Sequence, residues 1–346
     1  MVEASESMVA LESAPRATGA DAPPPRAPLG SSFKTPLSHR LAEKTIAALA
    51  LVAVVAVVLI FLFVAKEALP LFWEQASSAG LRLRDLVVAR QWPGYHEAVF
   101  VWQPVGEPAK FNVVPLFVGT LKVTLITMLV SVPVGVACAI YVSQYAGRRT
   151  REVVKPAIEL LAGVPSVVLG FFALIVLATW VQTAFGFTYR LNAIVAALGL
   201  SLAVVPVIFT ISEDALQAVP KHLGEAALAL GARKYQTTLR VIVPAALPGI
   251  AAAVILGFGR AIGETMIVLM ASGNAAVIDF FNPSTSVRTV TATIAAELGE
   301  VANGDEHWRV LFLLGLMLFG ITFVLNKLGS VAVARLHRKL TAEEAP

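Results

Sequence analysis

The sequence predicts an all-α, polytopic membrane protein with six transmembrane helices and both termini on the cytoplasmic side. Of its 346 residues, 57% are hydrophobic and 14% are charged, whereas a soluble domain carries roughly 25% charged residues. The mean hydropathy of +0.76 agrees with this composition. Two further observations give the number and direction of the helices: six long stretches contain few charges, and clusters of basic residues flank them.

Each stretch is long enough to cross a bilayer, since about 20 helical residues span roughly 30 Å of hydrocarbon. The first span lies within residues 34–70 and contains an uncharged run at 46–65, which is too long for the core of a cleaved signal peptide. The other predicted spans are residues 123–147, 160–189, 191–212, 241–278 and 310–326.

The basic residues set the topology. They precede the first span, separate the second from the third and the fourth from the fifth, and follow the sixth. The clusters are Lys34, Arg40 and Lys44; Arg148, Arg149, Arg151 and Lys155; Lys221, Arg233, Lys234 and Arg240; and Arg335, Arg338 and Lys339. With six spans all four clusters fall on one side, which the positive-inside rule makes cytoplasmic.

This topology divides the chain into segments. Residues 1–33 are rich in Ala, Pro and Ser and are expected to be a disordered tail. The remaining segments are the first span at 34–70, an extracytoplasmic segment at 71–113, a membrane core at 114–335 with a cytoplasmic coupling loop at 213–245 and an extracytoplasmic segment at 279–308, and a cytoplasmic tail at 336–346.

The segment 71–113 is too short for an independent core. Its aromatic residues are expected to anchor it at the membrane interface. Docking of an external partner is the alternative. These residues are Phe72, Trp73, Trp92, Phe100, Trp102 and Phe111.

The coupling loop contains a predicted short helix. Pro220 suits its first turn, and Gly231 suits the left-handed residue that closes it. Pro244 is expected to separate a second amphipathic piece from the fifth span. An apolar stripe comprises Leu223, Ala226, Ala227 and Leu230. This helix either packs on its own membrane domain or lies in a groove of another protein, where small side chains allow close approach and Glu225 supplies a charged hydrogen bond.

The fifth span contains two charges, Arg260 and Glu264. In a continuous helix they share a face and can pair, while Gly259 and Gly263 form a neighbouring stripe for close helix packing. Charged residues inside a span rarely face lipid. The pair is therefore a structural lock or the lining of a polar route, and an Arg in such a route suits an oxyanion. In the second case Glu264 would neutralise Arg260 when the route is empty.

Two other stretches stand out. In the third span, Pro165 with Gly163 and Gly170 predicts a kink or a close helix contact, and Glu159 is expected to pair with Lys155. Residues 288–300 are moderately apolar and could dip into the outer leaflet as a short helix, for which a surface cap is favoured over a gate.

Several functional classes have no support. The sequence contains no Gly-Lys dipeptide and hence no phosphate-binding loop of the Walker type. The five His residues lack metal-ligand spacing, so no metal site is predicted, and the single Cys138 forms no intrachain disulfide. The basic residues are interpreted as markers of the cytoplasmic side of the membrane and not as a nucleic-acid-binding surface. An ion-gradient-driven secondary transporter and a non-transporting scaffold remain alternatives.

Four motifs together resemble the PstC-type permeases of bacterial phosphate ABC importers: IELLAGVPSVVLG at 158–170, GEAALALGARKY at 224–235, GFGRAIGETM at 257–266 and RTVTATIAAELGE at 288–300. The spacing of the coupling-loop motif is kept, with Val241 and Val243 replacing Ile and Leu. The similarity covers about residues 45–335.

The resemblance implies a type I-like importer permease in the bacterial inner membrane. The partners would be a PstA-like sister permease, a dimer of ATP-binding subunits and an extracytoplasmic phosphate-binding protein. This chain would bind no cofactor, and its partner would use the ATP. In the family, the charged residues that match Arg260 and Glu264 are tied to phosphate movement, and the Glu225 loop is tied to the ATPase. We therefore expect the translocation path to include Arg260, Glu264 and the adjoining Thr265, and the ATPase-coupling residues to be Glu225, Ala226, Ala227 and Gly231. Physics alone indicates an anion, so another oxyanion remains open.

Overall fold

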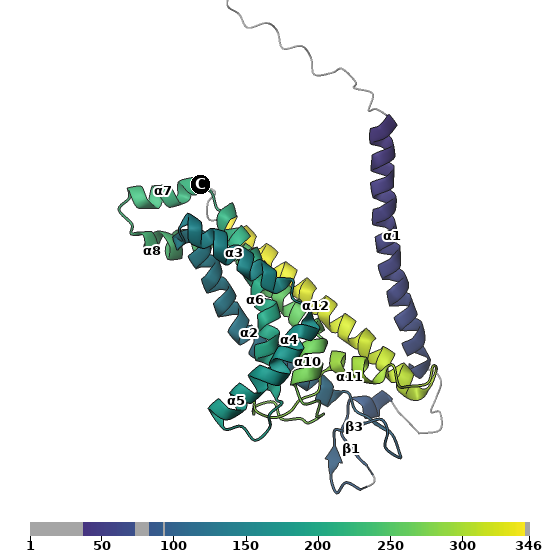
Figure 1. Ribbon diagram of the computed structural model, residues 1–346. Coiled ribbons are helices and arrows are strands. Elements are labelled where there is room, and N and C mark those ends of the chain that lie inside the picture. Colours follow the sequence, from purple (N-terminus) through teal and green to yellow (C-terminus); the bar gives the residue numbers. More distant parts are fainter. Residues whose placement is uncertain (1–36, 73–82, 93, 343–346) are drawn as a thin grey trace, which may run out of the picture. The chain divides into compact units, whose positions relative to one another are not determined.

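The computed structural model describes residues 37–72, 83–92 and 94–342 (Figure 1). The expected disordered tail, residues 1–33, and Trp73 of the external segment lie outside the described residues. The chain divides into two units, residues 1–57 and 58–346. The described part of the first unit belongs to helix α1 (Leu37–Ala68), which continues into the second unit.

Within the described residues, six helical segments are long and apolar enough to cross a membrane, which confirms the predicted number of spans. The third begins at residue 166 instead of 160, and the fifth ends at 263 instead of 278. The segments are Leu41–Phe72, Val114–Tyr145, Ser166–Phe185, Ala193–Ala218, Lys234–Gly263 and Glu306–Arg335.

Helix α6 (Ala193–Ala218) is central to the second unit and packs on α2 (Val114–Ile140) and α9 (Val243–Gly263). Glycines bring these helices close. A Cβ on Gly135 of α2 would lie 2.9 Å from a side-chain carbon of Ile208, and one on Gly257 of α9 would lie 2.8 Å from the same side chain. Such close packing stabilises helix pairs in a membrane, where lipid is as apolar as the helix surface.

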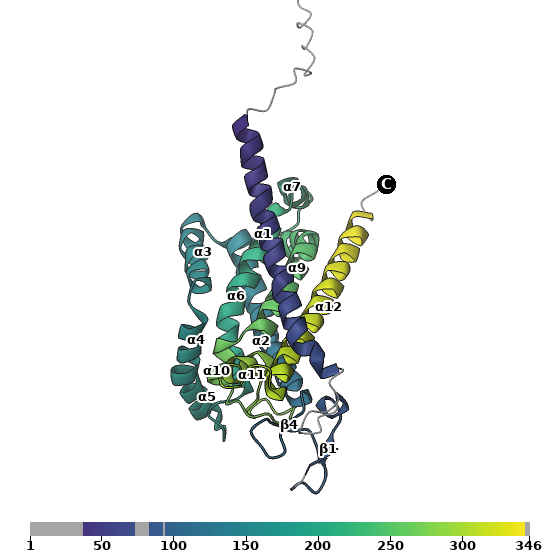
Figure 2. The same ribbon diagram turned by 90° about the vertical axis from the view of Figure 1, so that its right-hand side faces the viewer.

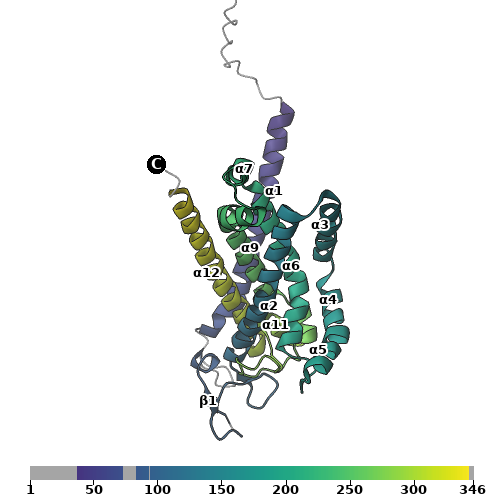
Figure 3. The same cartoon turned by 90° about the vertical axis from the view of Figure 1, so that its left-hand side faces the viewer.

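The second unit has two distinct ends, seen in Figures 2 and 3. The basic end carries α3 (Arg148–Ala162), α7 (Lys221–Ala229) and α8 (Lys234–Thr237). The opposite end carries α5 (Ala178–Phe185), α10 (Met266–Ala271), α11 (Val290–Glu297) and four short strands. Helix α12 (Glu306–Ala342) starts at the opposite end, packs on α9 and continues past the predicted sixth span into the expected tail.

The third span is shorter than predicted because Pro165 interrupts it. Helix α3 ends at Ala162, Pro165 has an extended backbone (φ −57°, ψ 137°), and α4 (Ser166–Phe172) begins after it. Pro165 is exposed and acts as a break instead of a packing residue. The close contact is made by Gly170, where a Cβ would lie 2.8 Å from Sδ of Met270. A π-helical turn, η4 (Ala173–Leu177), joins α4 to α5.

Two further π-helical turns lie at the basic end: η3 (Tyr141–Tyr145), after α2, and η5 (Thr238–Ile242), between α8 and α9. Through η5, residues Lys234–Gly263 form one helical segment. The expectation that Pro244 separates the loop from the fifth span is therefore wrong. Pro244 lies in the first turn of α9, and the looser π turn before it accommodates the missing N–H.

The described part of the external segment contains regular secondary structure. It contains the 3₁₀ turn η2 (Leu83–Leu86) after η1 (Leu69–Phe72) and two antiparallel strand pairs. The strands are β1 (Arg90–Gln91) with β2 (Ala98–Val99), and β3 (Trp102–Gln103) with β4 (Lys110–Phe111).

Three of its aromatics are not interface anchors. Trp92, Trp102 and Phe111 are 5%, 5% and 2% exposed. Trp102 and Phe111 join a core with the start of α2, α11 and α12. The segment thus shares a core with the helices and needs none of its own. Phe72 and Phe100 are exposed, as an anchoring role requires.

Candidate translocation site and partner surface

The fifth span breaks next to its charged residues. Helix α9 ends at Gly263, Glu264 adopts an extended conformation (φ −70°, ψ 136°), and α10 begins at Met266. The predicted continuous helix to residue 278 is therefore wrong. Interrupted helices inside a membrane are found where the backbone lines a cavity or is buried in protein, so the break marks this position as a candidate site.

The break separates the two charges that the sequence placed on one helix face. Arg260 lies exposed in the last turn of α9, whereas Glu264 is half-buried and no longer helical. Within the described ranges, no ion pair joins them. The helical Arg260–Glu264 pair is thus wrong for this structure. An exposed guanidinium in a span is too costly to leave in lipid, so this face must be covered by another protein or by water.

The two glycines expected to form one packing stripe, Gly259 and Gly263, differ in their surroundings. A Cβ on Gly259 would lie 3.3 Å from Oδ1 of Asn326 on α12, so Gly259 does serve close helix packing. Gly263 is exposed, and among the described residues no atom beyond its chain neighbours lies within 4 Å of such a Cβ. Gly257, two residues before Gly259, is buried against α6.

Helix α11 borders the break. The hydroxyl of Thr291 donates a hydrogen bond to the carbonyl oxygen of Glu264 at 2.8 Å. A mainly apolar hollow of about 570 Å³ lies beside it, lined by Thr265, Thr291, Ile294, Ala295, Leu298, Gly299 and Trp308. Thr265, predicted to lie on the path, therefore faces this hollow, and residues 290–297 form the short helix that the sequence suggested.

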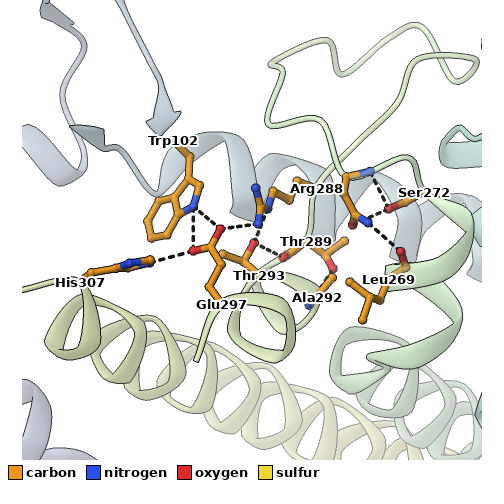
Figure 4. Close-up of polar contacts among 10 residues, drawn as sticks. Trp102, Leu269, Ser272, Arg288, Thr289, Ala292, Thr293, Glu297 and His307 are labelled. Carbon is orange, nitrogen blue, oxygen red and sulfur yellow. Dashed lines mark hydrogen bonds and ion pairs between the residues drawn. The ribbon is translucent and has the colours of Figure 1, made fainter. Parts of the chain in front are cut away.

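A cluster around Glu297 holds α11 at its other end (Figure 4). The Glu297 carboxylate accepts hydrogen bonds from Nε1 of Trp102 at 3.1 and 3.2 Å and from the guanidinium of Arg288, and its Oε2 lies 2.9 Å from Nε2 of His307. The Glu297 and His307 side chains are each 13% exposed. Strand β3, α11 and α12 are thus joined through one carboxylate.

A second buried charge on the opposite end is Lys122 of α2, which is 2% exposed. Its Nζ donates to the carbonyl oxygens of Asp279 and Asn282 at 2.6 and 2.5 Å and to Oγ1 of Thr285 at 2.7 Å. All three ammonium donors are therefore used, and they hold the loop after α10. The sequence interpretation began the second span after Lys122 and missed it.

At the basic end, α7 ends as the sequence predicted. Gly231 has φ +87°, its N–H donates to Leu228 O at 2.9 Å, and the N–H of Ala232 donates to Ala227 O at 3.1 Å. This pair of bonds is the Schellman motif, in which a glycine takes the left-handed position.

The apolar face of α7 is only partly covered by its own chain, since Leu223 is half-buried. Leu228 and Leu230 are 50% and 90% exposed, and Tyr235 of α8 is 50% exposed. Glu225 and Ala226 are exposed, and Ala227 is half-buried. An exposed apolar cluster rimmed by charge is typical of a protein interaction site, which favours docking over the alternative of packing on the membrane domain.

The base of this surface is fixed by an ion cluster. The fully buried carboxylate of Glu213 on α6 lies 2.7 Å from both Arg151 and Lys155 of α3. The hydrogen bond to Glu213 raises the pKa of Lys155 above its ordinary value, against the opposing effect of burial. The expected Lys155–Glu159 pair is absent from the ion pairs of the described residues, because Lys155 turns toward Glu213.

Comparison with known proteins gives the family. Residues 131–342 match the family described as "Binding-protein-dependent transport system inner membrane component". The chain belongs to this family. Together with the six apolar helices, this membership makes it a multi-pass membrane protein of the ABC-transporter permease type.

Individual relatives agree. The chain is 34% identical to the phosphate transport system permease protein PstC of Mesorhizobium japonicum over 262 residues, covering 70% of this chain and 78% of that protein. It is 33% identical to PstC 1 of Mycobacterium tuberculosis, covering 75% and 84%. A probable ABC transporter permease of Bacillus subtilis, YqgH, is 35% identical over 64% of this chain and 72% of that protein. These relatives confirm the PstC-type resemblance.

A solved structure supports the architecture. A chain of a bacterial alginate ABC transporter, crystallised with an alginate-bound periplasmic protein, superposes with a TM-score of 0.55. The match covers 87% of this chain and 98% of that chain at 14% identity. At this identity the likeness concerns the fold, and it confirms the predicted importer-permease architecture.

Proposed function

We propose that this chain is the pore-forming permease subunit of an ATP-driven phosphate importer in a bacterial inner membrane. The observation that carries the proposal is the exposed Arg260 beside a break in the fifth span, in a chain similar to PstC permeases over most of its length. A planar guanidinium stays charged and donates two parallel hydrogen bonds, which suits a phosphate oxyanion.

The chemistry at the break is transient binding. Arg260 attracts the anion, and Glu264 and Thr265 border the same stretch of backbone. A single cationic side chain gives a weak site, which a transport route needs because tight binding would prevent release. The idea that Glu264 neutralises Arg260 in the empty route has no support from this conformation, where the two are not paired.

Partners follow from the surfaces. A PstA-like sister permease would cover the face that exposes Arg260. A dimer of ATP-binding subunits would bind Glu225, Ala226, Ala227 and the exposed leucines of α7, with Gly231 fixing the end of that helix. An extracytoplasmic phosphate-binding protein would deliver substrate at the opposite end. The chain itself would hydrolyse no ATP and bind no cofactor, and its basic end and both termini would be cytoplasmic under the positive-inside rule.

The test is uptake of radiolabelled phosphate by the complex reconstituted in proteoliposomes with its binding protein. Arg260→Gln should abolish uptake while the complex still assembles, and Arg260→Lys should retain part of it because the charge remains. Normal uptake by the Gln variant would refute the site. Competition by sulfate or phosphonate distinguishes another oxyanion, and uptake driven by an ion gradient without ATP would support a secondary transporter.

A further inference from the structure

The backbone at the break of the fifth span needs hydrogen-bond partners, because helix-freed carbonyls in a membrane are not satisfied by lipid. The carbonyl of Glu264 finds its partner on another element, the hydroxyl of Thr291 in the first turn of α11. The O···O distance is 2.8 Å, which is typical of a good hydroxyl–carbonyl hydrogen bond.

The Thr291 hydroxyl also accepts a hydrogen bond from a neighbouring threonine. Oγ1 of Thr289 lies 3.4 Å from Oγ1 of Thr291. A hydroxyl has one hydrogen to donate, and that of Thr291 points to Glu264, so Thr289 is the donor between the two threonines. Thr289 also caps α11 by accepting from the N–H of Ala292 at 3.4 Å.

Helix α11 is a fixed support for Thr291. The N–H of Val290 donates to Oγ1 of Thr120 on α2 at 3.1 Å. A Cβ on Gly119 would lie 2.2 Å from the carbonyl oxygen of Arg288, so the chain entering α11 lies directly on α2. At the other end, Glu297 is held by Trp102, Arg288 and His307. The Thr291 hydroxyl is therefore presented from a helix anchored at both ends.

We propose that Thr291 is a positioning residue of the translocation path, an inference that rests on the proposed function. Its hydroxyl holds Glu264 in the extended conformation. Without that bond, the freed backbone is best satisfied by continuing α9 through Glu264, since helical hydrogen bonds are internal. Glu264 would then lie one turn from Arg260, where opposite charges pair. Thr291 thus keeps the guanidinium free for the anion.

The experiment compares three variants at this residue in the reconstituted complex. Thr291→Val removes the hydroxyl with little change of shape, and Thr291→Ala removes it without adding a methyl group. We expect both to lower the phosphate uptake rate per complex by about three- to tenfold, the range for one lost hydrogen bond. Thr291→Ser keeps the hydroxyl and should retain most of the rate. Equal losses in all three would overturn the proposal.

A matched control and a rescue separate positioning from general stability. Thr322→Val on α12 removes a hydroxyl bonded within its own helix and should leave uptake and thermal unfolding near wild type. Lower uptake in the Thr291 variants with an unchanged amount of assembled complex supports positioning. Lower assembly with a normal rate per complex would instead assign a purely structural role.

The mechanism also predicts that the competing ion pair causes the loss. In a Glu264→Gln background, Thr291→Val should lower the remaining uptake less than in wild type, since no carboxylate is left to pair with Arg260. If Arg260→Gln loses uptake but Thr291→Val does not, the role given to Thr291 is wrong while the proposed function still stands. If Arg260→Gln transports normally, the proposed function itself fails.

Discussion

The two ends of the second unit are built in opposite ways. At the basic end, the side chains of Leu228 on α7, Leu230 just after it and Tyr235 on α8 are exposed. At the opposite end, buried Lys122 and Glu297 bind loops and helices together. The basic end exposes an apolar surface that a partner can bind, whereas the opposite end is held together by its own buried polar contacts. Substitutions should therefore affect coupling to a partner at the first and stability at the second.

The largest effect is expected at Leu230, the exposed leucine at the C-terminal end of α7. Leu230→Asp puts a charge on the surface proposed to dock the ATPase, and we expect ATP-driven uptake to fall at least tenfold, which corresponds to about 1.4 kcal/mol. Thermal unfolding of the isolated chain should not change, because Leu230 is 90% exposed. Leu230→Met keeps an apolar side chain of similar size and is the control. Full uptake with the Asp variant would remove α7 from the docking surface.

At the opposite end, Glu297→Gln should reduce stability by about 2–4 kcal/mol, since it leaves the charge of Arg288 without its carboxylate in a site that is mostly buried. Denaturant unfolding in detergent measures this difference. Glu300→Gln, an exposed neighbour, should be neutral. If both variants unfold alike, the cluster around Glu297 does not lock this end.

Lys122→Met should cost about 1–3 kcal/mol, because the carbonyls of Asp279 and Asn282 and the Thr285 hydroxyl lose a buried donor. Limited proteolysis within residues 279–285 should accelerate in parallel. The comparison variant is Lys327→Met, an exposed lysine of α12. Unchanged proteolysis of the loop would show that Lys122 does not hold it.

The smallest effect concerns pH at the basic end. The pKa of Lys155 is raised from an ordinary 10.5 by its hydrogen bond to Glu213. A raised lysine pKa contributes stability that is complete below the unfolded value and is lost as pH rises through the folded value. The stability difference between wild type and Lys155→Met should be constant from about pH 6 to 9 and shrink above pH 10.5. A difference that grows in that alkaline range would contradict the bond.

Sequence predicted the basic end better than the opposite end, for a physical reason. The end of α7 depends on local rules, and Gly231 alone indicated the left-handed cap. The contacts of Lys122 join residues more than 150 positions apart, which no local pattern reveals. A lysine at the edge of an apolar run was the available signal, because a charge entering a membrane needs partners.

The sequence predicted which residues form the candidate site but not how the backbone arranges them. Arg260 and Glu264 stand out because charges in a span are rare, and Thr265 adjoins them in the GFGRAIGETM motif. Their spacing of four suggested one helix face, but the helix ends at Gly263. The terminating interaction comes from Thr291 on α11, so the break could not be inferred from the residues around it.

The π turn at Thr238–Ile242 affects how this chain would respond to the deletion of a single residue. A π turn holds one residue more than the α-helical path it replaces. Removing one residue there would let the backbone return to an ordinary helix and would keep the segments on its two sides nearly in phase, because each path completes about one turn. The leucines at the C-terminal end of α7 would keep their direction, and the membrane spans would stay intact. Removing one residue within the regular part of α9 would instead rotate the docking helix by about 100° relative to the rest of the span.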